Sequence, residues 1–499
     1  MGNQRKLGAA LSYINIIAKN LVTFLYVPFL LRFVGQANYG LFQMTNSVMV
    51  SLSLLSMGFS SAYVKFYITY KVNKQYDQLK KLNALYLILF GAISVIAMII
   101  GAVLVINTGA IFGRSLTASE VRLTTYLMAI MVFDVAITFI SSVFDSNITV
   151  NEQFIFQQSR QLMQTFLVPI ICIPLVLMGV GVLSIAITQI SVTILFLLIN
   201  INYCLNKLNM SFDFRNIDFS LLKELGLFSF FIFLNQIVDL VNNNVPNFIL
   251  GMFQGAKMVA TFAIAVQVKN MFFMLSTSLS SVFVPKVNQL VNLYKSKTVL
   301  TDLMIKVGRM QMALLFFVLG GFIVVGKFFV RIWAGAENVE AYYLIILMVL
   351  PSIIPLCQNV GIEIQRAMNK HIFRSIVYVV FAIVNIVITI FGSIYFGLIG
   401  ASMGYVITIL CANGIAMNWY YSKKMGLEIG RYWSETTKIL IPFAVATIPL
   451  IFLQSNIAVN SFTRFIIFGL VYSFIYIAIY LRFTINSTEK QLLLGFFKR

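Results

Sequence analysis

The sequence is poor in the residues that enzymes and metal sites use. It has one histidine, four cysteines and 16 acidic residues in 499, and only 10% of its residues are charged. No Cys-x-x-Cys pair occurs, so neither a zinc site nor a disulfide framework is predicted. Walker phosphate loops, nucleophile elbows and zinc-protease motifs are also missing. We therefore expect a protein that is not an enzyme, holds no metal and has no cofactor of its own.

Apolar residues dominate the chain instead. They make up 60% of it, and the mean hydropathy is +0.91. A soluble protein of this length needs far more polar residues to cover its core. A helix needs about 20 apolar residues to cross a bilayer, and a barrel strand about half as many. The long continuous runs predict an all-α integral membrane protein with about 14 transmembrane helices. They lie at residues 11–34, 41–64, 83–106, 123–146, 155–178, 182–204, 226–250, 258–284, 310–330, 341–360, 373–391, 396–420, 437–454 and 462–481.

The net charge of +20 is distributed unevenly between the two sides of the predicted membrane. With the N-terminus inside, 27 of the 36 lysines and arginines fall in inside segments and seven fall outside. This asymmetry follows the positive-inside rule. The basic residues therefore face anionic lipid headgroups, and no nucleic acid is expected as a partner. Both termini are predicted to be cytoplasmic.

An internal repeat divides the chain. With a shift of 220 residues, the segment 15–64 matches 235–284, and a later stretch matches with a shift of 218. The most informative identities are Asn15/Asn235, Gly35/Gly255, Ser60/Ser280, Ser61/Ser281, Gly179/Gly397 and Ser184/Ser402. Each half holds six spans, an even number, so the two halves enter the membrane in the same direction. We predict two pseudo-symmetric parallel six-helix lobes plus two extra C-terminal helices.

The domain limits follow from this repeat. We expect an N-lobe at 1–204, a cytoplasmic linker at 205–225 and a C-lobe at 226–421. The last two helices and a cytoplasmic tail occupy 422–499. Two lobes of this kind can enclose a central site and rock against each other.

Charged residues inside the spans mark the candidate site. Lys19 maps onto Asp239 in the repeat, one turn after the matched pair Asn15 and Asn235. A charge that faces lipid costs at least about 2.5 kcal/mol, so both must face the interior. Two interpretations stay open: a structural pair joining the helices, or groups lining a water-filled cavity together with Asn242.

Other spans carry further polar residues. Lys269 and Ser276 share one helix face. Asp134 is either a proton site or a capped polar residue. Asp145 and Glu363 match in the repeat near the inner side, where a gate or helix-end role is expected.

Several sequence segments resemble one family of membrane proteins. Residues 27–48, VPFLLRFVGQANYGLFQMTNSV, look like the first outside turn of the polysaccharide flippases of the multidrug/oligosaccharidyl-lipid/polysaccharide exporter superfamily. The matching positions are Pro28, Leu30, Arg32, Gly35, Tyr39, Gly40 and Leu41. FFVRIWAGAEN (328–338), with Trp333 and Gly335, resembles the turn after the ninth helix. QRAMNKH (365–371) and GLIGASMGYVIT (397–408) resemble two later segments.

The resemblance implies a function and a location. Such proteins move an undecaprenyl pyrophosphate-linked oligosaccharide from the inner to the outer leaflet of the bacterial plasma (inner) membrane by alternating access. They serve O-antigen, lipopolysaccharide, capsule or related polysaccharide biosynthesis, with a glycan polymerase and chain-length machinery as partners. Lys19 and Lys269 would bind the diphosphate, because lysine acts as a point charge for phosphate. Asp134 and Asp239 depart from a purely cationic cavity. Without an ATP motif, transport would use a H⁺ or Na⁺ gradient or the substrate's own gradient.

Two other functions compete with this one. A drug or cation antiporter of the same superfamily would use the interior acids to bind its cargo. A membrane-embedded glycan polymerase or ligase would need sizeable outside loops, which this sequence lacks.

Overall fold

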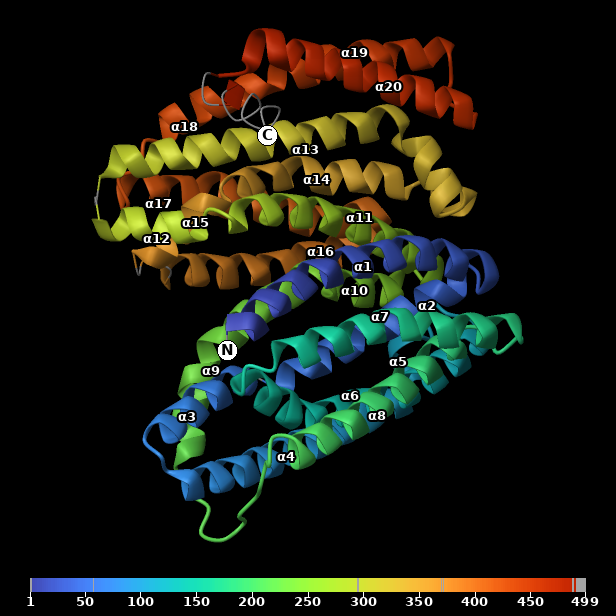
Figure 1. Ribbon diagram of the computed structural model, residues 1–499. Coiled ribbons are helices and arrows are strands. Elements are labelled where there is room, and N and C mark those ends of the chain that lie inside the picture. Colours follow the sequence, from blue (N-terminus) through green and yellow to red (C-terminus); the bar gives the residue numbers. More distant parts are fainter. Residues whose placement is uncertain are drawn as a thin grey trace. The chain divides into compact units, whose positions relative to one another are not determined.

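The computed structural model describes residues 2–56, 58–293, 296–368, 370, 372–486 and 489–490. The described residues form helices and connecting loops, with no strand among them. They divide into two compact units, Met1–Ala260 and Thr261–Arg499, whose helices Figure 1 labels. The all-α prediction is confirmed, whereas the expected lobe limits at 204 and 226 stay a prediction.

The first unit contains ten α-helices and the first turn of an eleventh. They are α1 (Gly2–Phe33), α2 (Gln36–Ser53), α3 (Phe59–Val72), α4 (Tyr76–Ile106), α5 (Thr108–Phe112), α6 (Ala118–Val150), α7 (Phe154–Leu177), α8 (Leu183–Asn206), α9 (Leu221–Asn243), α10 (Val245–Phe253) and α11 (Ala256–Ser281). A short 3₁₀ turn, η1 (Leu54–Ser56), continues α2. Helix α6 packs against α4, α8 and α2, and α1 packs along α7. Helix α6 therefore stands at the centre of this unit.

Aromatic packing and a buried amide pair hold α3, α4 and α6 together. The ring of Tyr63 lies 4.8 Å from that of Tyr86, edge to face. The Tyr63 hydroxyl donates to Asn83 Oδ1 at 2.7 Å and accepts from Asn147 Nδ2 at 2.9 Å. The hydroxyl thus uses both of its hydrogen-bonding roles inside the apolar core, so its burial carries no unsatisfied group.

The second unit contains the rest of α11 and the helices that follow. They are α12 (Val284–Leu293), α13 (Lys297–Trp333), η2 (Ala336–Asn338), α14 (Ala341–Cys357), α15 (Asn359–Ala367), α16 (Ile372–Thr408), the π-helix η3 (Ile409–Met417), α17 (Asn418–Lys423), α18 (Ile429–Thr436), η4 (Thr437–Ile439), α19 (Leu440–Asn456), α20 (Phe462–Ile479) and the π-helix η5 (Tyr480–Thr484). Helix α13 packs against α14, α18, α19 and α20. Gly320 makes room for Tyr472 of α20: an added Cβ would lie 2.2 Å from the tyrosine oxygen.

The repeat-matched glycines share a backbone conformation. Gly35 and Gly255 have φ of +90° and +86°, and each precedes the first residue of a helix. Gly179 and Gly397, matched at the other shift, also have positive φ, +88° and +58°. Side-chain-bearing residues rarely adopt this region, so the turn geometry requires glycine at each position. The likeness supports the repeat at the level of its turns.

The helices also bear on the number of spans. Among the described residues, 11 helices are long and apolar enough to cross a membrane, or 12 when the bent pair α14 and α15 is counted as one span. One candidate, Ile372–Lys423, has 52 residues and contains the non-helical residue Gly397. At about 1.5 Å per residue it is far longer than a bilayer core of about 30 Å, so it amounts to two spans. The total of about 14 stays a prediction.

Candidate functional site

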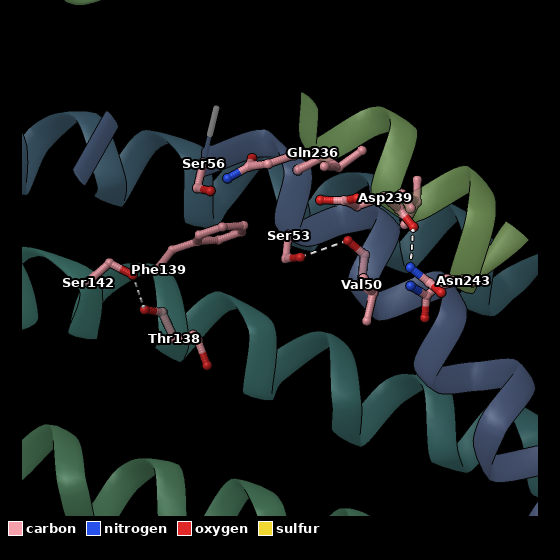
Figure 2. A pocket seen from close by; sticks show the side chains of 12 residues that line it. Val50, Ser53, Ser56, Thr138, Phe139, Ser142, Gln236, Asp239 and Asn243 are labelled. Atoms are coloured by element: carbon pink, nitrogen blue, oxygen red, sulfur yellow. Dashed lines mark hydrogen bonds between the residues drawn. The ribbon is translucent and has the colours of Figure 1, made fainter. Parts of the chain in front are cut away.

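A polar cavity lies in the first unit between α2 with η1, α6 and α9. Its volume is about 360 Å³. Figure 2 shows its lining: Val50, Ser53, Leu54 and Ser56; Thr138, Phe139 and Ser142; and Gln236, Asp239, Leu240, Asn243 and Asn244. Eight of these twelve side chains are polar. Small-molecule sites occupy about 300–1,000 Å³, so this cavity has the size of a small binding site.

Three of the four hydroxyls that line the cavity donate their protons to their own helices. Ser53 donates to the carbonyl of Val50 at 2.7 Å. Thr138 donates to Asp134 O at 2.8 Å, and Ser142 to Thr138 O at 2.9 Å. A hydroxyl has one proton and two acceptor lone pairs. Each of these groups therefore presents acceptor capacity on the cavity side.

Asp239 is the one ionisable residue among the described cavity lining. Its side chain is exposed, and its backbone carbonyl accepts from Asn243 Nδ2 at 3.1 Å, as Figure 2 shows. Asn242, one residue earlier than Asn243, is half-buried. The side chain of Asn235 lies outside the described part of the chain. Asp239 is thus the predicted site residue that reaches the cavity.

Asn15 and Lys19 of α1, which were predicted to belong to one polar site, have different surroundings in the structure. Asn15 is buried, and its Nδ2 donates to both the backbone and side-chain oxygens of Gln158 on α7, each at 2.7 Å. Lys19, one turn later, is exposed. Within the described residues Lys19 forms no ion pair, so the structure does not show the structural pair with Asp239. Asn15 instead joins α1 to α7.

Two acids of α6 have different surroundings. Asp134 is half-buried, and its Oδ1 is buried without a hydrogen-bond partner among the described residues. Asp145 forms an ion pair with Arg160 of α7 and accepts from Asn200 Nδ2 of α8 at 3.0 Å. The Asp145 cluster connects three helices of the first unit, and its predicted role at a gate stays a prediction.

Lys269 is buried in this structure, and its expected role as a cavity cation stays a prediction. The side chain is 1% exposed, and its ammonium lies 4.2 Å from the centre of the Tyr405 ring and 6.0 Å from that of Phe273. An aromatic face attracts a cation, so the ring helps to solvate the buried charge. Ser352 Oγ lies 2.7 Å from the Tyr405 hydroxyl and 2.6 Å from Met348 O. Because the serine proton goes to that carbonyl, the tyrosine donates to the serine.

Ser276 is also buried, and it is saturated with hydrogen bonds. Its hydroxyl donates to Leu356 O at 2.7 Å and accepts from Gln311 Nε2 at 2.9 Å and Asn359 Nδ2 at 3.1 Å. In this structure Ser276 joins α11 to α13, α14 and α15, and its expected place in a cavity stays a prediction. Glu363 forms an ion pair with Arg366 one turn later at 2.8 Å.

The sequence did not predict a buried ion pair between Arg309 and Glu489. Arg309 of α13 is 1% exposed; its Nε donates to Glu489 Oε1 at 2.6 Å and its Nη2 to Glu489 Oε2 at 3.0 Å. It also donates to the backbone carbonyls of Glu435 and Thr484 at 2.6 and 2.7 Å. In the sequence Arg309 counts as one of the basic residues on the inner side of the membrane. Its contact with Glu489 could not be predicted, because the two residues are 180 positions apart in the chain. The cavity residues Ser53, Ser56, Ser142 and Gln236 were missed for a related reason: serine and glutamine are common in spans.

Sequence comparison relates the chain to one family. The family described as "Polysaccharide biosynthesis protein" matches residues 8–291, more than half of the chain. No curated protein matches the sequence significantly.

Several solved structures share the fold of this chain. "Lipid II flippase MurJ, inward closed conformation" is 15% identical with a TM-score of 0.72, covering 95% of this chain and 99% of that one. A multidrug resistance MATE family transporter of the MOP superfamily, inward-facing, is 14% identical with a TM-score of 0.59, covering 84% and 94%. A mutant of the Vibrio cholerae MATE transporter VcmN is 13% identical with a TM-score of 0.52, covering 87% and 100%. At these identities the likeness establishes the fold alone, which this chain shares with these three proteins.

Proposed function

The chain belongs to the polysaccharide biosynthesis protein family, and from this premise we propose that it is a flippase for a lipid-linked oligosaccharide. The cargo is an undecaprenyl pyrophosphate-linked repeat unit. The protein moves it from the inner to the outer leaflet of the bacterial plasma membrane by alternating access. The product serves O-antigen or a related surface polysaccharide, and a glycan polymerase with its chain-length machinery uses it next.

One observation carries the proposal: a polar cavity inside an otherwise apolar helical fold. Eight polar side chains line the space of about 360 Å³, and two of its walls, α2 and α6, belong to candidate membrane spans. Polar groups at membrane depth are costly and mark the path of a polar cargo. Hydroxyls, amides and a carboxylate suit the hydroxyls of a sugar, which both donate and accept hydrogen bonds.

The two lysines are the proposed ligands of the diphosphate. Lys19 is exposed and can meet an anionic headgroup directly. Lys269 is buried against Tyr405, so it can do so only in another conformation of the transport cycle. A hydrogen bond from an ammonium to an anion contributes about 1.5–3 kcal/mol, so each lysine is worth about 10- to 100-fold in affinity.

Transport is proposed to be coupled to a H⁺ or Na⁺ gradient. Asp134 is the candidate coupling group, because one of its carboxylate oxygens is buried without a partner among the described residues. Asp134→Asn is expected to flatten the dependence of transport on pH or sodium. An unchanged profile with full transport would exclude Asp134 from coupling.

Genetic complementation tests the flippase directly. Deletion of the gene is expected to abolish the surface polysaccharide while its lipid-linked repeat units accumulate on the inner leaflet. The wild-type gene should restore display, and Lys19→Ala at equal protein level should restore it poorly. Loss of the repeat units themselves would indicate a biosynthetic enzyme instead and contradict the proposal.

A cation antiporter is the second candidate, and Asp239 favours it. A carboxylate at a cavity between membrane helices is what a cationic drug would require. An antiporter would raise the resistance of the deletion strain to cationic dyes without restoring polysaccharide. If the gene restores the polysaccharide and leaves dye resistance unchanged, the result supports the flippase and contradicts the antiporter.

A further inference from the structure

Helix α2 approaches the first residue of α11 so closely that no side chain fits between them. A Cβ added to Gly40 would lie 1.8 Å from the carbonyl oxygen of Ala256. Both residues are buried and belong to the first unit. A carbonyl oxygen is part of the backbone and cannot rotate away as a side chain can. A methyl group at Gly40 would therefore have to push the two segments apart.

A second close contact lies one turn further along α2. A Cβ added to Gly251 of α10 would lie 2.1 Å from the sulfur of Met44. Met44 is fully buried, but a methionine side chain has three rotatable bonds and can adjust to an added methyl group. The contact at Gly40 therefore tolerates less change than the contact at Gly251.

The segment around α5 covers the same end of α10. The ring of Phe112 lies 5.5 Å from that of Phe248, edge to face. Ser115 Oγ lies within hydrogen-bonding distance of the carbonyl oxygen of Gly251. Gly251 is in the last turn of α10, where carbonyls lack a donor from their own helix. The serine supplies such a donor, so α5 and α10 are joined by one polar and one aromatic contact.

These contacts lie next to the polar cavity, on one side of it. Along α2, Val50 lines the cavity six residues after Met44, and Asn244 lines it seven residues before Gly251. At about 1.5 Å per residue, the contacts are about 10 Å from the lining. The predicted topology places this end of α2 and α10 at the outer side of the membrane. The contacts therefore lie between the cavity and the predicted outer surface.

We propose that these contacts form an outer seal, closed in this structure, which separates to release the cargo from the cavity to the outer leaflet. The inference rests on the proposed flippase function. The sequence repeat assigns α2 and α5 to the first half of the chain and α10 and α11 to the second, so the seal connects the two halves. None of its residues is charged, so opening leaves no buried ion without a partner. The seal consists of Gly40, Met44, Phe112, Ser115, Phe248, Gly251 and Ala256.

Access to the cavity from outside tests the seal. Ser142→Cys places a thiol in the cavity lining, and a membrane-impermeant maleimide is added to spheroplasts. The protein with its four native cysteines gives the background. A closed seal predicts slow labelling of Ser142→Cys alone. Adding Gly40→Ala should speed labelling about tenfold, because the methyl group disfavours the closed contact. Gly251→Ala should speed it less, about threefold, since Met44 can adjust.

Gly109→Ala is the matched control. Gly109 begins the second residue of α5 at the same predicted outer end, and a Cβ added there would lie 3.9 Å from Val121 Cγ1, an ordinary contact. Labelling should then stay at the rate of Ser142→Cys alone. Thermal unfolding in detergent shows whether each variant is folded. Equal labelling rates for folded Gly40→Ala and Gly109→Ala would overturn the seal.

A cross-link tests the seal without any glycine variant. Phe112→Cys and Phe248→Cys are joined by a short bifunctional methanethiosulfonate reagent, and each single variant is the control. The cross-linked protein should lose transport of lipid-linked oligosaccharide in proteoliposomes and recover it on reduction. Full transport by the cross-linked protein, or a pair that does not cross-link, would overturn the seal and leave the flippase intact.

The two readouts separate the seal from the proposed function. Labelling reports access to the cavity and does not need transport. If Gly40→Ala opens the cavity to the maleimide while the unmodified protein moves no lipid-linked oligosaccharide, the seal is supported and the flippase is contradicted.

Discussion

Polar residues are arranged differently in the two units. In the first, Ser53, Thr138 and Ser142 line a cavity and donate only to carbonyls of their own helices. In the second, Ser276 is fully buried and meets three partners, and Lys269 is covered by an aromatic ring. The same residue types thus stabilise packing in one place and leave binding capacity in another. Their hydrogen-bond partners, and not their identity, separate the two roles.

The largest expected effect concerns the Arg309–Glu489 pair in the second unit. Arg309→Met leaves a buried carboxylate without its bidentate partner, which costs about 3–5 kcal/mol of stability. Thermal unfolding in detergent measures the loss. The double variant Arg309→Met with Glu489→Leu should recover most of it, because both charges are then gone.

Arg431 provides the control for this pair. It forms ion pairs with Asp302 at 2.8 Å and Glu428 at 3.2 Å, but its side chain is 49% exposed. Arg431→Met should cost at most about 1 kcal/mol. Equal losses for Arg309→Met and Arg431→Met would show that burial does not strengthen the first pair.

Ser276→Ala is expected to have the next largest effect. The change removes a bond to Leu356 O and leaves the amides of Gln311 and Asn359 without this acceptor, which costs about 1–3 kcal/mol. Ser281→Ala on the same helix is the control, because Ser281 is exposed and bonds only within its own helix. A stability loss for Ser276→Ala no larger than for this control would show that the three hydrogen bonds of Ser276 do not stabilise the second unit.

Lys269→Met separates stability from transport. The variant gives up the contacts of the ammonium, among them a cation–π contact worth up to about 2 kcal/mol, but no longer buries a charge, so we expect stability to fall by no more than about 2 kcal/mol. Transport of a lipid-linked oligosaccharide should nevertheless fall by about tenfold or more, since a diphosphate loses a cation. Normal transport with unchanged stability would remove Lys269 from the mechanism.

Ser142→Ala should have the smallest effect on stability, within about 0.5 kcal/mol. Its hydroxyl faces the cavity and bonds only to its own helix, so water can fill its place. A stability loss near that of Ser276→Ala would mean that the cavity residues stabilise packing. The polar residues of the two units would then have the same role.

The sequence predicted those features that depend on local pattern. Long apolar runs predicted the helices, and the repeat paired Gly35 with Gly255, which both have a positive φ. Asp239 was identified because a charge in an apolar run is costly wherever it lies. The sequence could not tell that Lys269 and Ser276 are buried, because burial depends on which helices pack against them. Tyr405 lies 136 residues after Lys269, and nothing in the sequence around it indicates that its ring contacts the ammonium.

The most direct test of the flippase is a leaflet-accessibility measurement in proteoliposomes. Lipid-linked oligosaccharide extracted from the deletion strain is placed in both leaflets, and a membrane-impermeant glycosidase removes sugar from the outer leaflet. With the wild-type protein, digestion should continue beyond the outer pool until nearly all of the lipid is cut, whereas Lys19→Ala should slow this second phase. Digestion that stops at the outer pool with folded wild-type protein would contradict the account.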